Sequence, residues 1–222
     1  EGGGCGAGVS PDLSGWGARL LRPLPGGARS RLWLCERDGG LFVARAVREG
    51  EAGLRWQDRV QAMAGRCGIA VARMVPAASG AFARGGMVLE PFLEGMPGRG
   101  ADLAALAPCI ARLHRATQDW PQRPGYREAM LPFGLAARLP MPLGPVAVVH
   151  GDLHAGNVLR LPSGRLALID WEEARVDAVR VDRMALARRP SLAAEVMACW
   201  HAEPARARRL ARRAMAGATG PA

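Results

Sequence analysis

The chain has 222 residues, 49% of them apolar, which is enough for a sizeable core in one large domain or two small lobes. Its formal net charge is +10, and all 30 basic residues are arginines, scattered except for one dense run at 206–213. Aromatic residues make up only 5% of the chain, with one tyrosine and four phenylalanines among them, so there is little aromatic interleaving for base stacking and we expect no nucleic-acid partner.

The cysteine spacing and the hydropathy exclude further classes of protein. Five cysteines are widely spaced and form no C-x-x-C pair, so neither a zinc knuckle nor a disulfide framework is indicated. No apolar run reaches the roughly 18 residues of a membrane helix, and no signal peptide is visible. We therefore expect a cytoplasmic protein with reduced thiols and no membrane partner.

The N-terminal part is predicted to be rich in strands. Residues 1–15 are Gly-rich and predicted to be flexible. Two apolar runs, 29–37 and 39–47, are joined by a turn signal at residues 37–40 and predict a β-hairpin. Helical spacing then predicts a helix over 51–68, with Gly68 after its C-terminus, and 83–98 holds another strand.

The C-terminal part is predicted to be mainly helical. The stretch 102–120 has one apolar stripe, with Asp102 as the expected N-cap. Residues 121–145 are rich in Pro and Gly and predict loops around a short helix. A buried strand is expected at 145–149, and one or two helices with a basic outer face at 191–216.

The most informative stretch is "HGDLHAGNVLRLPSGRLALID", residues 150–170. Its first part is too polar and Gly-broken for a strand, while 158–161 and 165–169 predict a tight hairpin around 162–164. The hairpin brings Asn157 close to Asp170, and Asp152 projects from the same loop. Oxygen ligands too few for a full cage suit Mg²⁺ held partly by substrate phosphates. Asp152 can then accept a proton from a hydroxyl.

The same stretch resembles a known family. Residues 150–157 fit the spacing H-x-D-x-x-x-x-N of the kinase catalytic loop. The fuller pattern "HGDLHAGNVL…LIDWEEA" closely resembles the aminoglycoside phosphotransferase and choline kinase superfamily. Weaker similarities are "LPGGARSRLWLC", "LFVAR", "MVLEPFLEG", "IARLH" and Asp182 in "VDRMA", so that the resemblance covers about residues 20–190.

The resemblance implies an α+β, two-lobed protein-kinase-like fold, with a small β-rich N-lobe at 16–93 and a mainly helical C-lobe at 94–222. It also implies an ATP- and Mg²⁺-dependent small-molecule kinase that phosphorylates a hydroxyl. Asp152 would orient or deprotonate the acceptor hydroxyl, while Asn157 and Asp170 would hold Mg²⁺ on the ATP phosphates.

The nucleotide would be held by residues of the N-lobe. Backbone N–H groups near the glycines would approach the phosphates, Arg45 would stand where the family usually has a lysine, and the segment joining the lobes would bind adenine through a carbonyl and an N–H. The expected residues are Gly26, Gly27, Ser30, Arg45, Glu90 (carbonyl) and Phe92 (N–H).

One assignment stays open, and several polar residues near the site are expected to have structural functions. The carboxylate that should pair with Arg45 could be Glu51 or Asp58, or be replaced by Gln57. We expect the histidines near the site and the acid of "VDRMA" to be buried or loop-fixing hydrogen-bond partners, and Trp171 to pack. These residues are His114, His150, His154 and Asp182.

Two other functions compete with the kinase. A pseudokinase would keep the fold as a binding or regulatory module without transfer. A metallophosphoesterase would need more ligands than the four histidines of the chain offer. From residue 171 onward six acidic residues face ten arginines, which favours a neutral or anionic alcohol over a polycationic aminoglycoside. The sequence indicates no oligomeric state.

Overall fold

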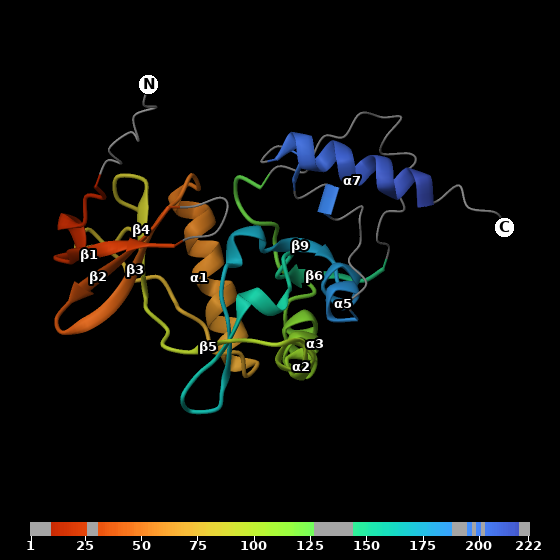
Figure 1. Ribbon diagram of the computed structural model, residues 1–222, viewed down its shortest axis with the longest axis horizontal. Coiled ribbons are helices and arrows are strands. Elements are labelled where there is room, and N and C mark those ends of the chain that lie inside the picture. The colour runs from red at the N-terminus through yellow and green to blue at the C-terminus, as the bar shows by residue number, and fades with distance from the viewer. Residues whose placement is uncertain are drawn as a thin grey trace, which may run out of the picture. The chain divides into compact units, whose positions relative to one another are not determined.

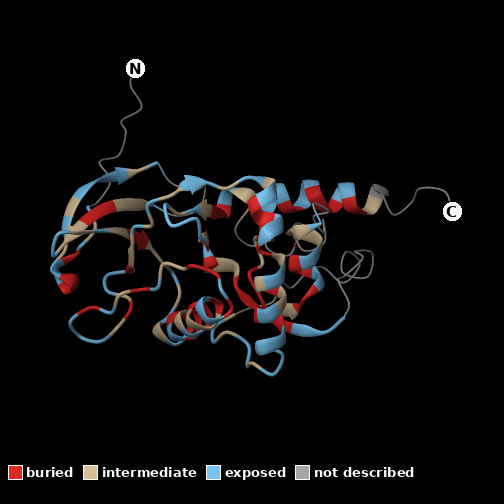
Figure 2. Cartoon of the chain, turned by 90° about the horizontal axis from the view of Figure 1, so that it is seen from below, coloured by how far each residue is buried: buried red, intermediate tan, exposed pale blue. Residues whose placement is uncertain are grey.

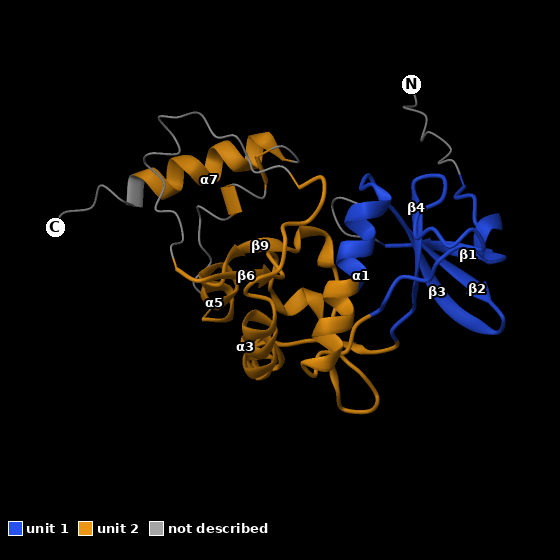
Figure 3. Cartoon of the chain, turned by 180° about the vertical axis from the view of Figure 1, so that it is seen from behind, with its two compact units in different colours: residues 1–58, 72–93 blue, residues 59–71, 94–222 orange. Residues whose placement is uncertain are grey.

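The computed structural model describes residues 10–25, 31–126, 144–187, 195–196, 199–200 and 203–217. The chain forms two compact units, Glu1–Asp58 with Ala72–Leu93, and Arg59–Val71 with Glu94–Ala222 (Figure 3). The division falls within helix α1 (Glu51–Arg66), so each unit takes part of that helix. Over the described ranges, no helix combines the length and the apolar character needed to cross a bilayer.

The first unit contains a four-stranded antiparallel sheet (Figure 1). Its strands, in spatial and chain order, are β1 (Arg19–Leu24), β2 (Leu32–Arg37), β3 (Gly40–Ala46) and β4 (Met87–Pro91). The predicted hairpin is confirmed, because Asp38 and Gly39 turn between β2 and β3 with φ of 51° and 76°. Both angles are positive, as a two-residue turn of the right twist requires.

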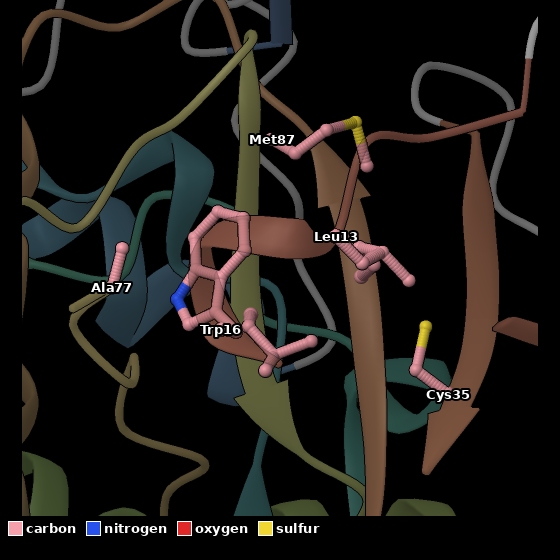
Figure 4. Packing of buried hydrophobic residues seen from close by; sticks show 7 residues of the cluster. Leu13, Trp16, Cys35, Ala77 and Met87 are labelled. Atoms are coloured by element: carbon pink, nitrogen blue, oxygen red, sulfur yellow. The ribbon is translucent and has the colours of Figure 1, made fainter. Parts of the chain in front are cut away.

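The two faces of this sheet are both covered. On one face Ala44, Met87 and Leu89 join a cluster with Leu13 and Trp16 from the N-terminal 3₁₀ segment (Figure 4). On the opposite face Val88 packs with Leu54 of α1, Met74 and Phe82, and Val47 borders this cluster. Because side chains alternate along a strand, Arg45 and Glu90 belong to the face that α1 covers.

Helix α1 confirms the prediction for 51–68. Glu51 lies in its first turn and accepts hydrogen bonds from the N–H groups of Phe82 (3.0 Å) and Ala83 (3.4 Å). Gly68 follows the last turn with φ of 96°, a conformation that favours glycine after a helix C-terminus.

The second unit has two small antiparallel sheets and several helices. The sheets have the orders β5-β7-β8 and β6-β9. Their strands are β5 (Met96–Pro97), β6 (Val146–Val149), β7 (Val158–Arg160), β8 (Leu166–Leu168) and β9 (Arg175–Ala178). The helices are α2 (Gly100–Ala105), α3 (Ala107–Ala116), α5 (Arg180–Leu186) and α7 (Pro204–Gly217). The strand predicted at 145–149 and the hairpin over 158–169 are thereby confirmed.

The helix predicted over 102–120 is wrong in two respects. Helix α2 starts earlier, with Arg99 as N-cap, and Asp102 is the third helical residue, whose carboxylate accepts the Arg99 N–H at 2.8 Å. The helix also breaks at Leu106, and α3 begins with Pro108 in its first turn. Proline lacks an N–H and crowds the preceding turn, which explains why one stripe became two helices.

Candidate active site

The loop 150–157 joins β6 to β7, and the hairpin β7–β8 returns the chain to Asp170. The Ile169 N–H donates to the Asn157 carbonyl at 2.9 Å, one residue before Asp170. The hairpin therefore places Asn157 beside the segment that carries Asp170, as the sequence predicts.

Asn157 also ties the loop to itself. Its Nδ2 donates to the Asp152 carbonyl at 2.9 Å, and lies 3.5 Å from the Asp152 carboxylate. Asn157 is buried, whereas the side chain of Asp152 is 45% exposed. The amide nitrogen is thus occupied by the loop, and the amide oxygen is the atom suited to a cation. The half-exposed Asp152 carboxylate can meet a substrate.

Asp170 has an unusual backbone conformation. Its φ and ψ are 62° and 64°, in the left-handed region that residues other than glycine rarely adopt. The next residue, Trp171, is buried and donates from Nε1 to the Leu168 carbonyl at 2.9 Å. The packing function expected for Trp171 is confirmed. The left-handed backbone of Asp170 thus directly precedes this anchored indole. Strain of this kind is concentrated at functional sites.

His150 is a buried structural residue of the loop, as expected. Its Nε2 lies 3.0 Å from the Ile169 carbonyl, and its Nδ1 accepts the Asp152 N–H at 3.3 Å. Since a carbonyl only accepts, the proton is assigned to Nε2. Its ring meets that of Trp171 edge to face at 4.7 Å. Burial lowers the pKa of His150 and outweighs the nearby carboxylates, so the ring stays neutral.

Asp182 anchors the loop from α5. Its carboxylate accepts the N–H groups of His150 (2.9 Å) and Gly151 (3.1 Å), and lies 3.0 Å from Nε2 of His114 on α3. Burial alone would raise the pKa of Asp182, but the hydrogen bonds and charge of its partners produce a net lowering. The anchoring function predicted for Asp182 and the satisfied core histidine predicted at 114 are confirmed. His154, by contrast, is 54% exposed.

Arg175, for which the sequence analysis makes no prediction, packs against the loop 150–157. Arg175 on β9 pairs with Val149 on β6 and is buried. Its guanidinium donates to the Glu173 carbonyl (3.0 Å) and to Asp177 (2.9 Å). A Cβ on Gly151 would lie 2.5 Å from Arg175 Nη1, so this guanidinium fills the space beside the glycine. The sequence feature that could have indicated this contact is the glycine between the histidine and the aspartate of the loop.

In the first unit, Arg45 is buried and has an acidic neighbour on the next strand. Its Nη2 lies 3.4 Å from a carboxylate oxygen of Glu90. Strand pairing explains this contact, because Val43 stands opposite Glu90 and Arg45 is the next residue on the same face.

The two carboxylates considered as helix partners of Arg45 both bind other groups. Glu51 caps backbone N–H groups and pairs with Arg55 at 2.9 Å, and Asp58 binds Arg73 at 2.7 and 3.0 Å. Gln57 is fully buried, and within the described ranges neither polar atom of its amide has a hydrogen-bond partner. Of the three alternatives, Gln57 is therefore the one whose polar atoms are not used by other contacts.

Of the other residues predicted to bind the nucleotide, only some belong to the described part of the chain. Gly26, Gly27 and Ser30 lie outside the described residues, in the connection between the paired Leu24 of β1 and Leu32 of β2. The Phe92 N–H donates to the Leu41 carbonyl at 2.9 Å. That donor is already used in the sheet, so it would have to leave its partner to bind an adenine.

The donor set fits a Mg²⁺ ion that is held partly by phosphate oxygens. Within the described part of the chain, no group of three or more His, Cys, Asp or Glu residues could hold a metal ion. Asn157 and Asp170 would supply one amide oxygen and one carboxylate, which are hard ligands that Mg²⁺ accepts when substrate phosphates and water complete its shell.

Solved structures with the protein-kinase-like phosphotransferase fold match most of the chain. An aminoglycoside phosphotransferase from Alicyclobacillus acidocaldarius is 17% identical with a TM-score of 0.57, and the match covers 82% of this chain and 72% of the other. The choline kinase LicA from Streptococcus pneumoniae is 18% identical with a TM-score of 0.51, covering 81% and 72%. The predicted α+β, protein-kinase-like fold is confirmed.

A family model matches part of the chain. Residues 133–212 match the model of the phosphotransferase enzyme family, so the predicted resemblance is confirmed over a stretch that includes the loop 150–157. A spectinomycin phosphotransferase solved in complex with ADP and spectinomycin is also similar, with 13% identity, a TM-score of 0.50 and coverage of 76% and 67%. None of the curated proteins matches the sequence.

Proposed function

We propose that this protein is a small-molecule kinase that transfers the γ-phosphoryl group of ATP to a substrate hydroxyl with the help of Mg²⁺. The observation that carries the proposal is the geometry of the loop 150–157. Asn157 bonds the Asp152 carbonyl through its side chain and Ile169 through its backbone, which gathers one amide and two acidic residues around the end of one hairpin. The match of 133–212 to a phosphotransferase family supports this assignment.

Asp152 would act on the acceptor. Its half-exposed carboxylate would accept a hydrogen bond from the substrate hydroxyl and take the proton as the oxygen attacks the γ-phosphorus. The bond between that phosphorus and the bridging oxygen breaks, and ADP leaves. His150 and Asp182 would act through the loop backbone, because both bind main-chain groups next to Asp152.

Asn157 and Asp170 would hold Mg²⁺, which when bound neutralises charge on the phosphates. Arg45 would bind phosphate oxygens through its planar guanidinium, with Glu90 limiting its orientation. We further propose that the segment with Gly26, Gly27 and Ser30 covers the phosphates, and that the Glu90 carbonyl accepts a hydrogen bond from the adenine. The ADP in the similar spectinomycin phosphotransferase supports a nucleotide co-substrate.

Calorimetric titration of ATP, with and without Mg²⁺, tests the nucleotide site. We expect Mg²⁺-dependent binding to wild type and none to Asp170→Ala. Asp119→Ala, which removes an exposed carboxylate after α3, is the matched control and should bind as wild type does. If wild type bound no nucleotide although folded, the pseudokinase alternative would replace this proposal.

ADP release with a panel of neutral and anionic alcohols tests the transfer step. Asp152→Ala should keep nucleotide binding and lose about 10²- to 10⁴-fold in turnover, the usual contribution of a general base. Normal turnover in this variant would exclude Asp152 as the base.

A further inference from the structure

Helix α7 (Pro204–Gly217) has a basic face that the proposed reaction does not use. Its buried residues are Ala207, Leu210, Ala211 and Ala214, and the last three form an apolar cluster with Val196 that is bordered by Trp200. Its exposed residues include Arg208, Arg209, Arg212 and Arg213. At 3.6 residues per turn these four arginines fall within an arc of about 140°, opposite the buried stripe. The alternation of buried and exposed segments along this helix is visible in Figure 2, in the helix nearest the C label.

The four arginines have no acidic partners over the described ranges. The acidic residues at the start of the helix, Glu203 and Glu195, both pair with Arg206, at 3.4 and 3.9 Å. No hydrogen bond or ion pair joins any described residue to the other four. Two pairs, 208 with 212 and 209 with 213, are spaced i,i+4, so like charges are neighbours and weaken the helix by a few tenths of a kcal/mol each.

The surrounding sequence does not neutralise this face. From Arg183 to the C-terminus there are eight arginines and only two acidic residues, the glutamates that pair with Arg206. This stretch therefore carries six of the ten net positive charges of the chain. A positive field of this density attracts polyanions.

We propose that the exposed arginine face of α7 binds the phosphate backbone of a nucleic acid without reading its sequence. Guanidinium groups bind phosphate bidentately, and residues four apart are separated by about 6 Å along the helix axis, a step comparable to the distance between successive phosphates. The face has no Asn, Gln or aromatic residue that would read or stack on bases. For this helix the proposal departs from the expectation of no nucleic-acid partner.

The buried side of α7 distinguishes this partner from a membrane. Helices that bind a bilayer surface insert an apolar face into the lipid. Here Leu210, Ala211 and Ala214 are already packed with Val196, and within residues 208–213 both residues other than arginine are buried. The surface offers charge alone, which suits a phosphodiester backbone.

Fluorescence anisotropy with a labelled 20-base-pair DNA duplex of arbitrary sequence tests the proposal. Binding should weaken with salt with a slope of log K against log salt of about −3 to −4, as about four phosphate contacts predict. The variant R208Q/R209Q/R212Q/R213Q should lose at least tenfold in affinity at low salt. ATP binding should not change, which separates this test from that of the kinase site.

The matched control is R22Q/R66Q/R115Q/R165Q, which removes the same charge from exposed, scattered positions. It should lose less than threefold in affinity. Equal losses in the two variants, or no duplex binding by wild type at 50 mM salt, would overturn the proposal. Binding to vesicles containing 25% phosphatidylserine but not to the duplex would also overturn it, in favour of a membrane partner.

Discussion

At the scale of single residues, Gly151 constrains the backbone of the loop 150–157. Its φ is 84°, and a Cβ at this position would lie 2.5 Å from both Arg175 Nη1 and the Glu173 carbonyl oxygen. The glycine is thus required twice, for a left-handed backbone and for the space that the buried guanidinium occupies. Its N–H also donates to Asp182, so a shift of Gly151 would move the backbone next to Asp152.

We expect Gly151→Ala to lower the free energy of unfolding by about 1 kcal/mol of left-handed strain and a further 1–3 kcal/mol of overpacking. Urea denaturation measures this change, and turnover should fall with it. Gly164→Ala is the control, because Gly164 has φ of 77° with nothing within 4 Å of a Cβ. Equal destabilisation in the two variants would show that crowding by Arg175 contributes nothing.

At the scale of elements, helix α1 carries a polar group into the core. Leu54 packs on Val88 of the sheet, and Gln57 follows one turn later on the buried side of the helix. A buried amide without a partner costs about 1–3 kcal/mol. A methionine has nearly the same length without the polar atoms.

We therefore expect Gln57→Met to raise the free energy of unfolding by about 1–2 kcal/mol in chemical denaturation. The exposed Gln118, changed to Met, should shift stability by less than about 0.5 kcal/mol. A destabilised Gln57→Met would mean that the amide already has a partner in solution. Nucleotide calorimetry on the same variant then shows whether ATP needs this amide.

At the scale of the whole molecule, the buried histidine of the loop makes stability depend on pH. The pKa of His150 lies below its ordinary value of 6.5 because burial disfavours the charged ring. Below pH 6.5 the unfolded chain therefore binds a proton that the folded chain does not. Stability should be constant above that pH and fall as pH drops below it, by at most about 1.4 kcal/mol per pH unit.

Thermal unfolding between pH 5 and 8 measures this dependence. His150→Asn should flatten the profile between pH 5 and 6.5, whatever its effect on stability at pH 8. The lowered pKa of Asp182 acts in a more acidic window, because its contribution is present above the ordinary carboxyl pKa of 3.8 and is lost as pH falls through the lowered value. An unchanged slope in His150→Asn would assign the dependence to another group.

Local sequence determined much of this protein. The two hairpins, the strand before the loop and the helix over 51–66 follow from side-chain periodicity and turn residues, which act over a few neighbours. The proximity of Asn157 to the Asp170 segment follows from the same rules, since a hairpin joins its own ends. The prediction of one helix over 102–120 was wrong because Pro108 and the capping carboxylate of Asp102 outweighed the apolar stripe.

Only the tertiary structure decided the contacts between distant segments. His114 and Asp182 are 68 residues apart, and the Asp182 carboxylate reaches the loop 31–32 residues before it. The contacts of Glu51 with the Phe82 N–H and of Asp58 with Arg73 likewise join segments that are distant in the sequence. The arginine run of α7 was visible in the sequence, but its separation from the buried stripe needed the helix and its packing. Such pairings depend on how elements pack, and periodicity within one segment carries no information about them.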